Sequence, residues 1–357
     1  MKTTAKLAIG AKILAAKLKG EVRPFFVQYV LLYGCDARCD YCNSPHRPAT
    51  QLSTAEHKEI LRQFARLGTV RVKFHGGEPL LRKDLGELLA EVKRLGMRAA
   101  VVTNGLMLPE RLDAVRRADE LVISLDGDEV THDRHRGAGT WRRVMRAIDL
   151  CKQEGIEFFL NAVVTRHSAG DIDWLLATAA RLGVMVNFQL LQTNEVAFGA
   201  HTTELMPAPE EIRAILAKIL AAKEAGAPVL FSAHSYRHTL NWPDFSLERL
   251  VRPAEVSPCT AGRYFLNVEP NGDLIPCALH GATFTAKNAL RDGVEAAWRH
   301  AQQHSCFDCY NTWLHESRAV FALRPAVLGN FWRNYLNPTR RRNGWEPSPC
   351  SGEKQHA

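Results

Sequence analysis

The sequence has no long hydrophobic run, few cysteines for its length and no secretory signal. Apolar runs such as Ala99–Val102 are far shorter than the roughly 20 residues of a membrane-spanning helix. Nine cysteines in 357 residues are too few for a disulfide scaffold. Charged residues make up 24% and hydrophobic residues 46%, a balance that excludes a disordered or fibrous protein. These absences predict a cytoplasmic protein whose clustered cysteines serve metal binding or catalysis.

Basic residues mark both ends of the chain, and the formal net charge is +8. Residues 1–22 predict a Lys-rich helix, with Leu7, Leu14 and Leu18 on one stripe and Ile13 nearly opposite. Such a helix packs on its own domain, which the two-sided pattern favours, or touches the inner membrane face peripherally through residues 1–20. Residues 337–357 predict a mobile tail. No nucleic-acid-binding motif accompanies the charge, so we expect no nucleic acid partner.

Residues 23–228 alternate short apolar runs with amphipathic stretches. The runs predict six strands, at 25–32, 70–74, 98–103, 120–124, 157–164 and 185–190. The amphipathic stretches between them predict helices, and residues 207–226 predict one more. This alternation predicts a parallel sheet, open or closed into a barrel, with its chemistry at the carboxyl ends of the strands.

A second unit is predicted after a connecting segment, residues 229–255. It spans residues 256–336 and contains a β-hairpin, because Tyr264–Val268 and Asp273–Pro276 flank the turn pair Asn271-Gly272.

Cys35, Cys39 and Cys42 form a C-x3-C-x2-C run directly after the first predicted strand. Three thiolates on one short loop can bind three irons of a cubane cluster and leave the fourth iron open to a small molecule. A Cys3His zinc site with His46 is the competing interpretation. The loop's place at the end of a strand favours iron and sulfur.

This run resembles the signature of the radical S-adenosylmethionine (radical SAM) superfamily, with Tyr41 as the aromatic residue before the third cysteine. The resemblance implies an α/β fold, a partial (β/α)6 barrel of the TIM type. It also implies a [4Fe–4S] cluster that binds S-adenosylmethionine and cleaves it to a 5′-deoxyadenosyl radical, which abstracts a substrate hydrogen.

Further motifs follow the other predicted strands in the order that the family shows. The Gly-Gly-Glu-Pro turn at residues 76–79 resembles the one that holds the methionyl ammonium. The resemblance gives Ser124 a ribose contact and Arg136 a contact with the methionyl carboxylate. The residues expected to bind this cofactor are Tyr41, Gly76, Gly77, Glu78, Ser124, Arg136, Asn161 and Leu190.

A second set of four cysteines lies in the C-terminal unit: Cys259, Cys277, Cys306 and Cys309. Four thiolates make a closed site, which alone suits zinc as well as iron. Behind a radical SAM barrel the pattern resembles the "twitch" domain, the short form of the SPASM domain, which implies one auxiliary [4Fe–4S] cluster. The longer SPASM pattern has a further cysteine where this chain has His315. Cys151 and Cys350 remain, the first as a buried small hydrophobe.

A closed auxiliary cluster suits electron transfer, so we expect an oxidoreductase that removes a substrate hydrogen and passes an electron to that cluster. The alternative is a bond-forming enzyme (C–C, C–S or adenosyl transfer) that acts on a lipid or peptide at the membrane surface. A small-molecule substrate fits the first hypothesis. A flavodoxin or ferredoxin would donate the electron.

Two further hypotheses, a peptide maturase and an iron–sulfur sensor, fit the sequence less well. Peptide maturases of this size often carry an extra N-terminal recognition domain, for which the roughly 23 residues before the first strand are too short. An iron–sulfur sensor would need clusters but not the S-adenosylmethionine motifs, which therefore argue against it.

For the substrate pocket, the sequence offers a polar and aromatic patch between Tyr236 and Trp242. His238 is the candidate proton acceptor, although a packing role is the ordinary alternative. His75, just before the Gly-Gly-Glu-Pro turn, is expected to form part of the pocket wall.

Overall fold

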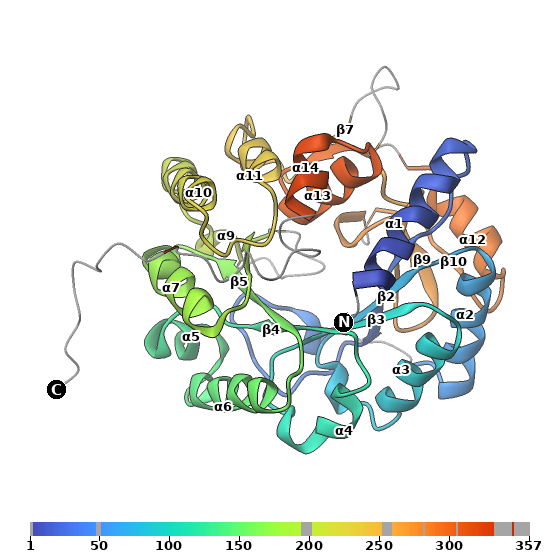
Figure 1. Cartoon of the computed structure of the whole chain (residues 1–357), viewed down its shortest axis with the longest axis horizontal. Helices are drawn as coiled ribbons and strands as arrows, with labels where there is room; N and C mark the ends of the chain where they lie inside the picture. The colour runs from blue at the N-terminus through green and yellow to red at the C-terminus, as the bar shows by residue number, and fades with distance from the viewer. Residues whose placement is uncertain are drawn as a thin grey trace.

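The structure, a computed structural model, describes residues 3–47, 51–193, 202–251, 259–280, 283–304, 306–331 and 345. It confirms the predicted α/β class, with a curved sheet inside and helices around its outer face (Figure 1). The predicted tail, with Cys350, lies outside the described residues apart from Trp345.

The strands form one large mixed sheet and one small sheet. The large sheet has the order β10-β9-β8-β1-β2-β3-β4-β5-β6, and the small one pairs β11 with β7. The strands are β1 (Phe26–Leu32), β2 (Arg71–Gly76), β3 (Arg98–Thr103), β4 (Glu120–Ser124), β5 (Phe158–Val164), β6 (Val186–Leu190), β7 (Arg249–Val251), β8 (Phe265–Val268), β9 (Asp273–Ile275), β10 (Lys287–Asn288) and β11 (Cys306–Cys309). Strands β1–β6 lie parallel and in chain order, as the β–α alternation predicts.

The helices mostly follow these strands one by one. They are α1 (Thr3–Leu18), α2 (Thr54–Arg66), α3 (Leu85–Arg94), α4 (Leu112–Val115), α5 (Glu129–Arg136), α6 (Thr140–Gln153), α7 (Ile172–Leu182), α9 (Thr202–Leu205), α10 (Pro209–Glu224), α11 (Ala233–Leu240), α12 (Val294–Ala301), α13 (Thr312–Phe321) and α14 (Pro325–Phe331). Helix α2 shows why they begin where they do. Ser53 accepts from the backbone N–H of Glu56, whose side chain accepts from the Ser53 N–H, a capping box.

The predicted C-terminal hairpin is present, and it joins the main sheet. β8 pairs antiparallel with β9 and parallel with β1, so that Phe26 lies opposite Phe265. The turn between β8 and β9 contains Gly272, which adopts φ +88°. The sequence predicted the hairpin but not its pairing with β1, because local turn chemistry does not specify a long-range partner strand.

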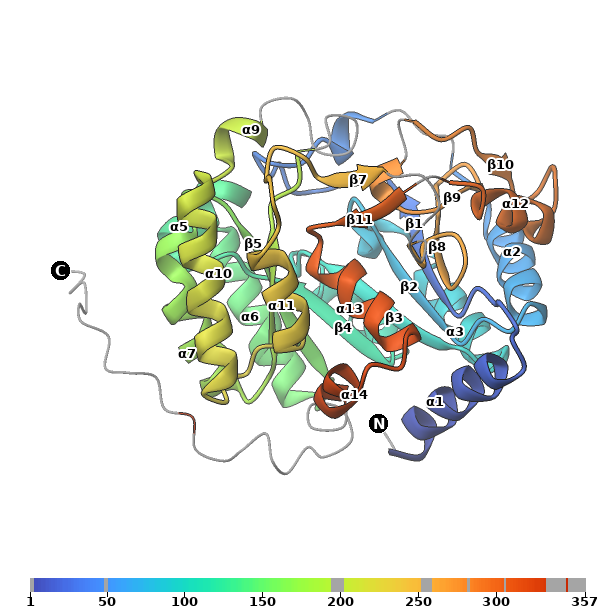
Figure 2. The ribbon, with the colours of Figure 1, turned by 90° about the horizontal axis from the view of Figure 1, so that it is seen from above.

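Helix α13 lies between the two ends of the parallel part of the sheet. It contacts β6 and α11, and its Trp313 ring meets the Phe265 ring of β8 edge-on at 5.1 Å. Figure 2 shows α11 and α13 side by side, with the strands behind them. The barrel is therefore partial, and a C-terminal helix occupies its open side.

The two faces of the sheet differ in chemistry because side chains alternate along each strand. On β2, Val72 and Phe74 are fully buried, in the same core cluster as the helix residues Ile60 and Phe64. The alternate residues Lys73 and His75 line an internal cleft. The hydrophobic core thus lies between sheet and helices, while the interior of the barrel is polar.

Helix α1 packs against its own domain, as the two-sided apolar pattern favours. Ile13 and Ala16 are buried in a cluster with Phe25 and Phe321. Leu18 is 80% exposed, and the predicted membrane contact of residues 1–20 stays a prediction. In the described part of the chain, every helix is too short or too polar to cross a bilayer.

Candidate active site

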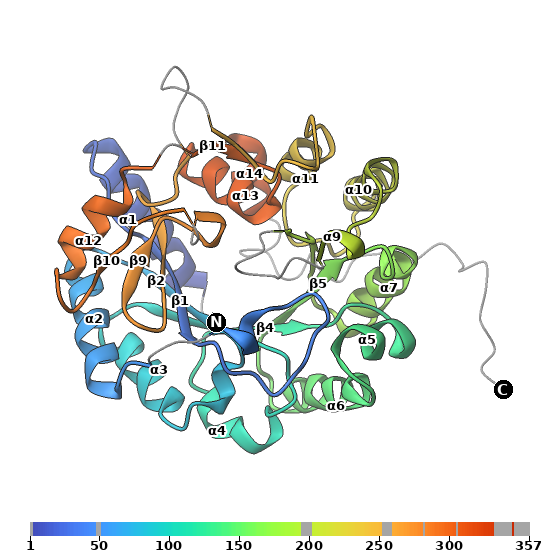
Figure 3. The same ribbon diagram turned by 180° about the vertical axis from the view of Figure 1, so that it is seen from behind.

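A cleft of about 370 Å³ lies inside the curved sheet, and both cysteine sets reach its wall. Cys35, Cys39 and Cys42 line it, and so does Cys277 of the second set. The first three belong to the segment after β1, which lies on the near side of the molecule in Figure 3. Carboxyl ends of parallel strands are where α/β sheets bind ligands.

The first cysteine loop turns tightly, with the Cys42 N–H donating to the Cys39 carbonyl at 3.1 Å. Burial raises the pKa of Cys35 to about 12 and that of Cys39 to about 11. Each of these two pKa values is raised further by another thiol of the loop, so the sulfur atoms lie within electrostatic range of one another. Because metal ligation requires thiolates, a bound cation would stabilise the charge that this site otherwise disfavours.

The geometry favours a cluster over the alternative zinc site. His46 is exposed and does not line the cleft, so it is not positioned as a fourth ligand. A cubane attaches each cysteine to a different iron atom, and three thiols spread along a cleft wall fit that requirement.

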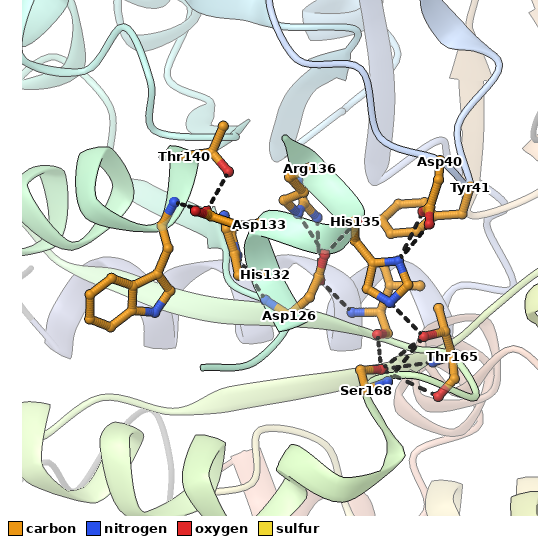
Figure 4. Close-up of polar contacts among 12 residues, drawn as sticks. Asp40, Tyr41, Asp126, His132, Asp133, His135, Arg136, Thr140, Thr165 and Ser168 are labelled. Atoms are coloured by element: carbon orange, nitrogen blue, oxygen red, sulfur yellow. Dashed lines mark hydrogen bonds and ion pairs between the residues drawn. The ribbon is translucent and has the colours of Figure 1, made fainter. Parts of the chain in front are cut away.

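Asp126 joins two of the predicted cofactor-binding residues (Figure 4). Tyr41 donates its hydroxyl to Asp126 Oδ2 at 2.6 Å, and Arg136 Nε donates to the same oxygen at 2.6 Å. Burial acts to raise the pKa of Asp126, but the Arg136 guanidinium holds it at about 2. Arg136 lines the cleft, and its Nη1 has no acceptor among the described residues, so this nitrogen is the one left for a ligand carboxylate.

Helix α5 fastens the cysteine loop to the sheet (Figure 4). His135 Nδ1 lies 2.9 Å from Asp40 in the loop, and His135 Nε2 lies 2.8 Å from Thr165 Oγ1 just after β5. The Asp40 N–H also donates to the His135 carbonyl at 3.0 Å. One side chain thus links the loop to a neighbouring strand end.

The Gly-Gly-Glu-Pro turn lies directly against the backbone that starts the cysteine loop. The Gly77 N–H donates to the Leu32 carbonyl at 2.8 Å. A Cβ on Gly77 would lie 2.0 Å from the Gly34 carbonyl oxygen, so only glycine permits this contact. Gly76 and Gly77 both line the cleft.

Glu78 occupies a different place from the one predicted. It is fully buried, does not line the cleft, and accepts hydrogen bonds from Thr103 Oγ1 at 2.9 Å and the Asn104 N–H at 2.8 Å. Burial raises its pKa to about 7. Its carboxylate therefore ties the turn to the end of β3, and its predicted contact with an ammonium group stays a prediction.

Of the remaining residues predicted to contact the cofactor, two have side chains on the face of the sheet that lines the cleft and one does not. Ser124 at the end of β4 and Asn161 on β5 line the cleft, and Asn161 also accepts from Asn187 Nδ2 at 2.7 Å. The Leu190 side chain is buried outside the cleft lining, whereas its neighbour Gln189 lines it. Strand alternation directs the Leu190 side chain to the other face, and the predicted contact of this residue with the cofactor stays a prediction.

The second cysteine set is buried and assembled from distant segments. The thiols of Cys259 and Cys306 form a hydrogen bond, the largest cause of the raised pKa of Cys259. Burial raises the pKa of Cys309, and the nearby Cys259 and Cys277 raise it further. The four thiols therefore form one group. As a donor set it fits a closed four-thiolate centre, and it leaves no coordination position open.

His238 lies behind this second set and does not line the cleft. Its Nε2 is 3.3 Å from the Cys309 carbonyl oxygen and 3.3 Å from Asp308 Oδ1. Its ring stacks on His315 at 3.6 Å. Tyr236 is likewise fully buried, in the hydrophobic core. Helix α11 turns His238 toward α13, as the packing alternative expects. Its predicted role as acceptor of a substrate proton gains no support from this position and stays a prediction.

Sequence reasoning missed three residues that shape the cleft or its wall: Asp126, Lys73 and Trp313. Asp126 lies two residues after Ser124, the predicted ribose contact, and an acid ten residues before a predicted ligand-binding arginine is a signal for a pair. Lys73 alternates with Phe74 on a predicted strand, which indicates an inward position. Nothing local marks Trp313, since α13 reaches the cleft only through the tertiary fold.

Comparison with known proteins gives concordant matches. A family model described as "Radical SAM superfamily" matches residues 29–178. "PqqA peptide cyclase" of Gluconobacter oxydans is 31% identical over 258 residues, which cover 69% of this chain and 68% of that protein. "Mycofactocin maturase MftC" of Mycolicibacterium smegmatis is 29% identical over 300 residues, 80% of this chain and 72% of that protein.

Among solved structures, Streptococcus suis SuiB bound to S-adenosylmethionine aligns with a TM-score of 0.62 at 20% identity. The alignment covers 79% of this chain and 68% of SuiB. At this identity the match supports the fold, a partial barrel with a C-terminal extension.

Proposed function

This chain belongs to the radical SAM superfamily, and on that premise we propose that it modifies a peptide by forming a new covalent bond within it. Enzymes of the family use S-adenosylmethionine and a [4Fe–4S] cluster. The relatives named above are a peptide cyclase and a maturase, which favours the bond-forming hypothesis over a small-molecule oxidoreductase. They also count against the argument that a short N-terminal segment disfavours a peptide substrate.

One observation carries the proposal: a single cleft is bordered by the open three-cysteine loop and by Cys277 of the closed four-cysteine set. A substrate in this cleft would lie next to both. We retain the division into a barrel at residues 23–228 and an auxiliary-cluster unit at residues 256–336 as part of the proposal.

Cys35, Cys39 and Cys42 would hold the cluster that binds S-adenosylmethionine, and Cys259, Cys277, Cys306 and Cys309 would hold an auxiliary [4Fe–4S] cluster. When bound, these groups supply a 5′-deoxyadenosyl radical that takes a hydrogen atom and an acceptor for one electron.

The chain's own side chains position and enclose the reactants. Asp126 orients Arg136 and Tyr41 beside the cysteine loop, and the close approach of Gly77 to Gly34 fixes the turn that faces the cofactor. Trp313 and Leu314 form the wall opposite the strands, which shields the cleft from water on the open side of the barrel.

Formation of an intramolecular cross-link satisfies both the oxidative and the bond-forming hypotheses. Joining two atoms that each carried hydrogen removes one hydrogen atom, one proton and one electron from the peptide. The product is therefore oxidised by two electrons, although its relatives are named for cyclisation or maturation. An electron donor such as a flavodoxin or ferredoxin is part of this proposal.

The proposal is tested with the anaerobically reconstituted protein, dithionite, S-adenosylmethionine and, one at a time, the short peptides encoded beside its gene. We expect one peptide to lose the mass of two hydrogen atoms, with 5′-deoxyadenosine formed in equal amount. Cys39→Ser is the inactive control. Formation of 5′-deoxyadenosine with every such peptide unchanged in mass would contradict a peptide substrate and leave the family chemistry intact.

A further inference from the structure

Lys73 is the centre of a polar row that crosses three adjacent strands inside the barrel. Gln28 on β1 lies opposite Lys73 on β2 and also opposite Asn267 on β8. All three side chains line the cleft. Because the three residues share one register position and one face, their side chains form a continuous patch of one amine and two amides.

No carboxylate in the cleft pairs with Lys73. Among the described residues that line it, none is Asp or Glu. No carboxylate in the described part of the chain lies within 4.0 Å of Lys73 Nζ, which instead lies 4.9 Å from the centre of the Trp313 ring. The nearby Glu120 is paired with Arg71. The other cation in the wall, Arg136, is paired with Asp126.

A cation in this position is incompletely stabilised. Burial, and then the charge of Arg71, lowers the pKa of Lys73 to about 7. A cation–π contact with Trp313 offsets only part of the cost of removing an ammonium group from water. An anion that entered the cleft would pair with the amine and accept hydrogen bonds from the neighbouring amide N–H groups, which would stabilise the charged form.

We propose that Lys73, with Gln28 and Asn267, binds a carboxylate of the substrate, so that the enzyme selects a peptide with an acidic residue at the point where it enters the cleft. This inference rests on the proposed peptide-modifying function, which it makes more specific.

S-adenosylmethionine also carries a carboxylate, but the residues around Lys73 favour the substrate as its source. Lys73 precedes Gly76 by three residues, which is about 10 Å along a strand. Arg136 Nη1, on the side of the cysteine loop, is the donor available to the cofactor. Lys73 instead lies among Asn267 and Trp313, from the C-terminal part of the chain that also carries Cys277.

The test compares two blocked tripeptides, N-acetyl-Ala-Glu-Ala-amide and its glutamine isostere, which differ in one charge. Their affinities for the holoenzyme are measured by equilibrium binding in the presence of saturating S-adenosylmethionine. We expect the glutamyl peptide to bind about tenfold more tightly or better, which is the size of a charge-assisted hydrogen bond. Lys73→Met should remove the difference, and Lys73→Arg should retain most of it.

Two controls separate binding from folding. Lys83→Met makes the same change at an exposed lysine outside the cleft and should behave as wild type. In the unmutated protein, mass spectrometry follows modification of Lys73 by an amine-reactive reagent. The glutamyl peptide should slow it several-fold more than the glutaminyl peptide does.

Equal affinity of the two peptides for the wild-type protein, or no detectable binding of either, would overturn the inference. So would a Lys73→Met variant that keeps the discrimination but loses affinity for S-adenosylmethionine, because the carboxylate would then be the cofactor's. In all these cases, formation of 5′-deoxyadenosine and a changed peptide mass would still support the proposed function, so the two failures are distinguishable.

Discussion

The two cysteine sets are built in opposite ways. The first lies within eight residues, Cys35–Cys42, on one loop whose thiols are partly exposed along the cleft. The second draws Cys259, Cys277 and the two ends of β11 from separate segments, and all four thiols are buried. A local, accessible set can leave a coordination position for a small molecule, whereas an enclosed set is suited to a closed centre.

The two sets also differ in the contacts that hold them in place. The first loop is fastened from outside by His135 and by Asp126 through Tyr41. The second contributes directly to a small core cluster with Phe265 and Leu314. We therefore expect damage to the first set to affect chemistry before stability, and damage to the second to affect both.

The largest effect is expected for Cys39→Ser. It removes one of three ligands of the open site, so 5′-deoxyadenosine formation should fall by more than about a hundredfold, beyond the loss caused by changes around a metal site. The iron content should drop by about half, while the thermal unfolding midpoint changes little. Cys151→Ala, at a buried cysteine of α6 outside both sets, is the matched control. A normal yield of 5′-deoxyadenosine from Cys39→Ser would contradict the assignment.

Cys309→Ser should impair peptide modification and stability while leaving S-adenosylmethionine cleavage in place. S-adenosylmethionine cleavage should persist without coupled peptide product, because the open site keeps its ligands. The unfolding midpoint should fall clearly, since a buried ligand set loses a member. Iron counting, calorimetry and peptide mass spectrometry together check this, and an unchanged peptide product would show that the second set is not needed for the chemistry.

Asp126→Asn should weaken the attachment of the first loop. Removing the carboxylate leaves the Arg136 guanidinium buried without its counter-ion, which costs about 3 kcal/mol or more. The folded pKa of Asp126 is about 2, below its ordinary value, so its stabilising contribution is present above about pH 4 and lost as the pH falls toward 2. The difference in unfolding midpoint between wild type and variant should therefore be constant at neutral pH and shrink below pH 4.

A smaller effect is expected where the two regions touch. Tyr33, just before the cysteine loop, donates its hydroxyl to Glu269 in the turn after β8. Burial raises the pKa of Glu269 to about 7. Because the folded protein then binds a proton that the unfolded chain releases, stability should fall as the pH rises from about 4.5 to 7, by no more than about 3 kcal/mol.

Glu269→Gln should reduce this pH dependence, and Glu110→Gln, at an exposed site, should leave it unchanged. Calorimetry at several pH values measures both. If the stability of wild type and of Glu269→Gln changed equally with pH, this carboxyl would not couple the two regions through its proton.

The sequence predicted the local features of the fold well. Strands at 98–103 and 120–124 match β3 and β4, and the Asn271-Gly272 turn forms as expected. Periodicity and turn chemistry act over a few residues, so they are readable without the fold. The pairing of β8 with β1 and the strand β11 are set by tertiary contacts, so the pattern did not reveal them.

The same distinction applies to the site. The C-x3-C-x2-C spacing is local and led to the first set, whereas the resemblance to the twitch domain led to the second. Glu78 and Leu190 were assigned through the resemblance, and the structure places neither side chain in the lining of the cleft. His238 looked like a pocket residue because its neighbours are polar and aromatic, but only the packing of α11 on α13 reveals which way it faces.

The central claim is that the first cysteine set holds a cluster open to S-adenosylmethionine and the second holds a closed one. Electron paramagnetic resonance of the reduced, reconstituted protein, recorded with and without S-adenosylmethionine, tests it most directly. The account predicts two cluster signals, of which S-adenosylmethionine shifts only the one that disappears in Cys39→Ser. A single signal that S-adenosylmethionine leaves unchanged, with zinc bound at the first set, would contradict it.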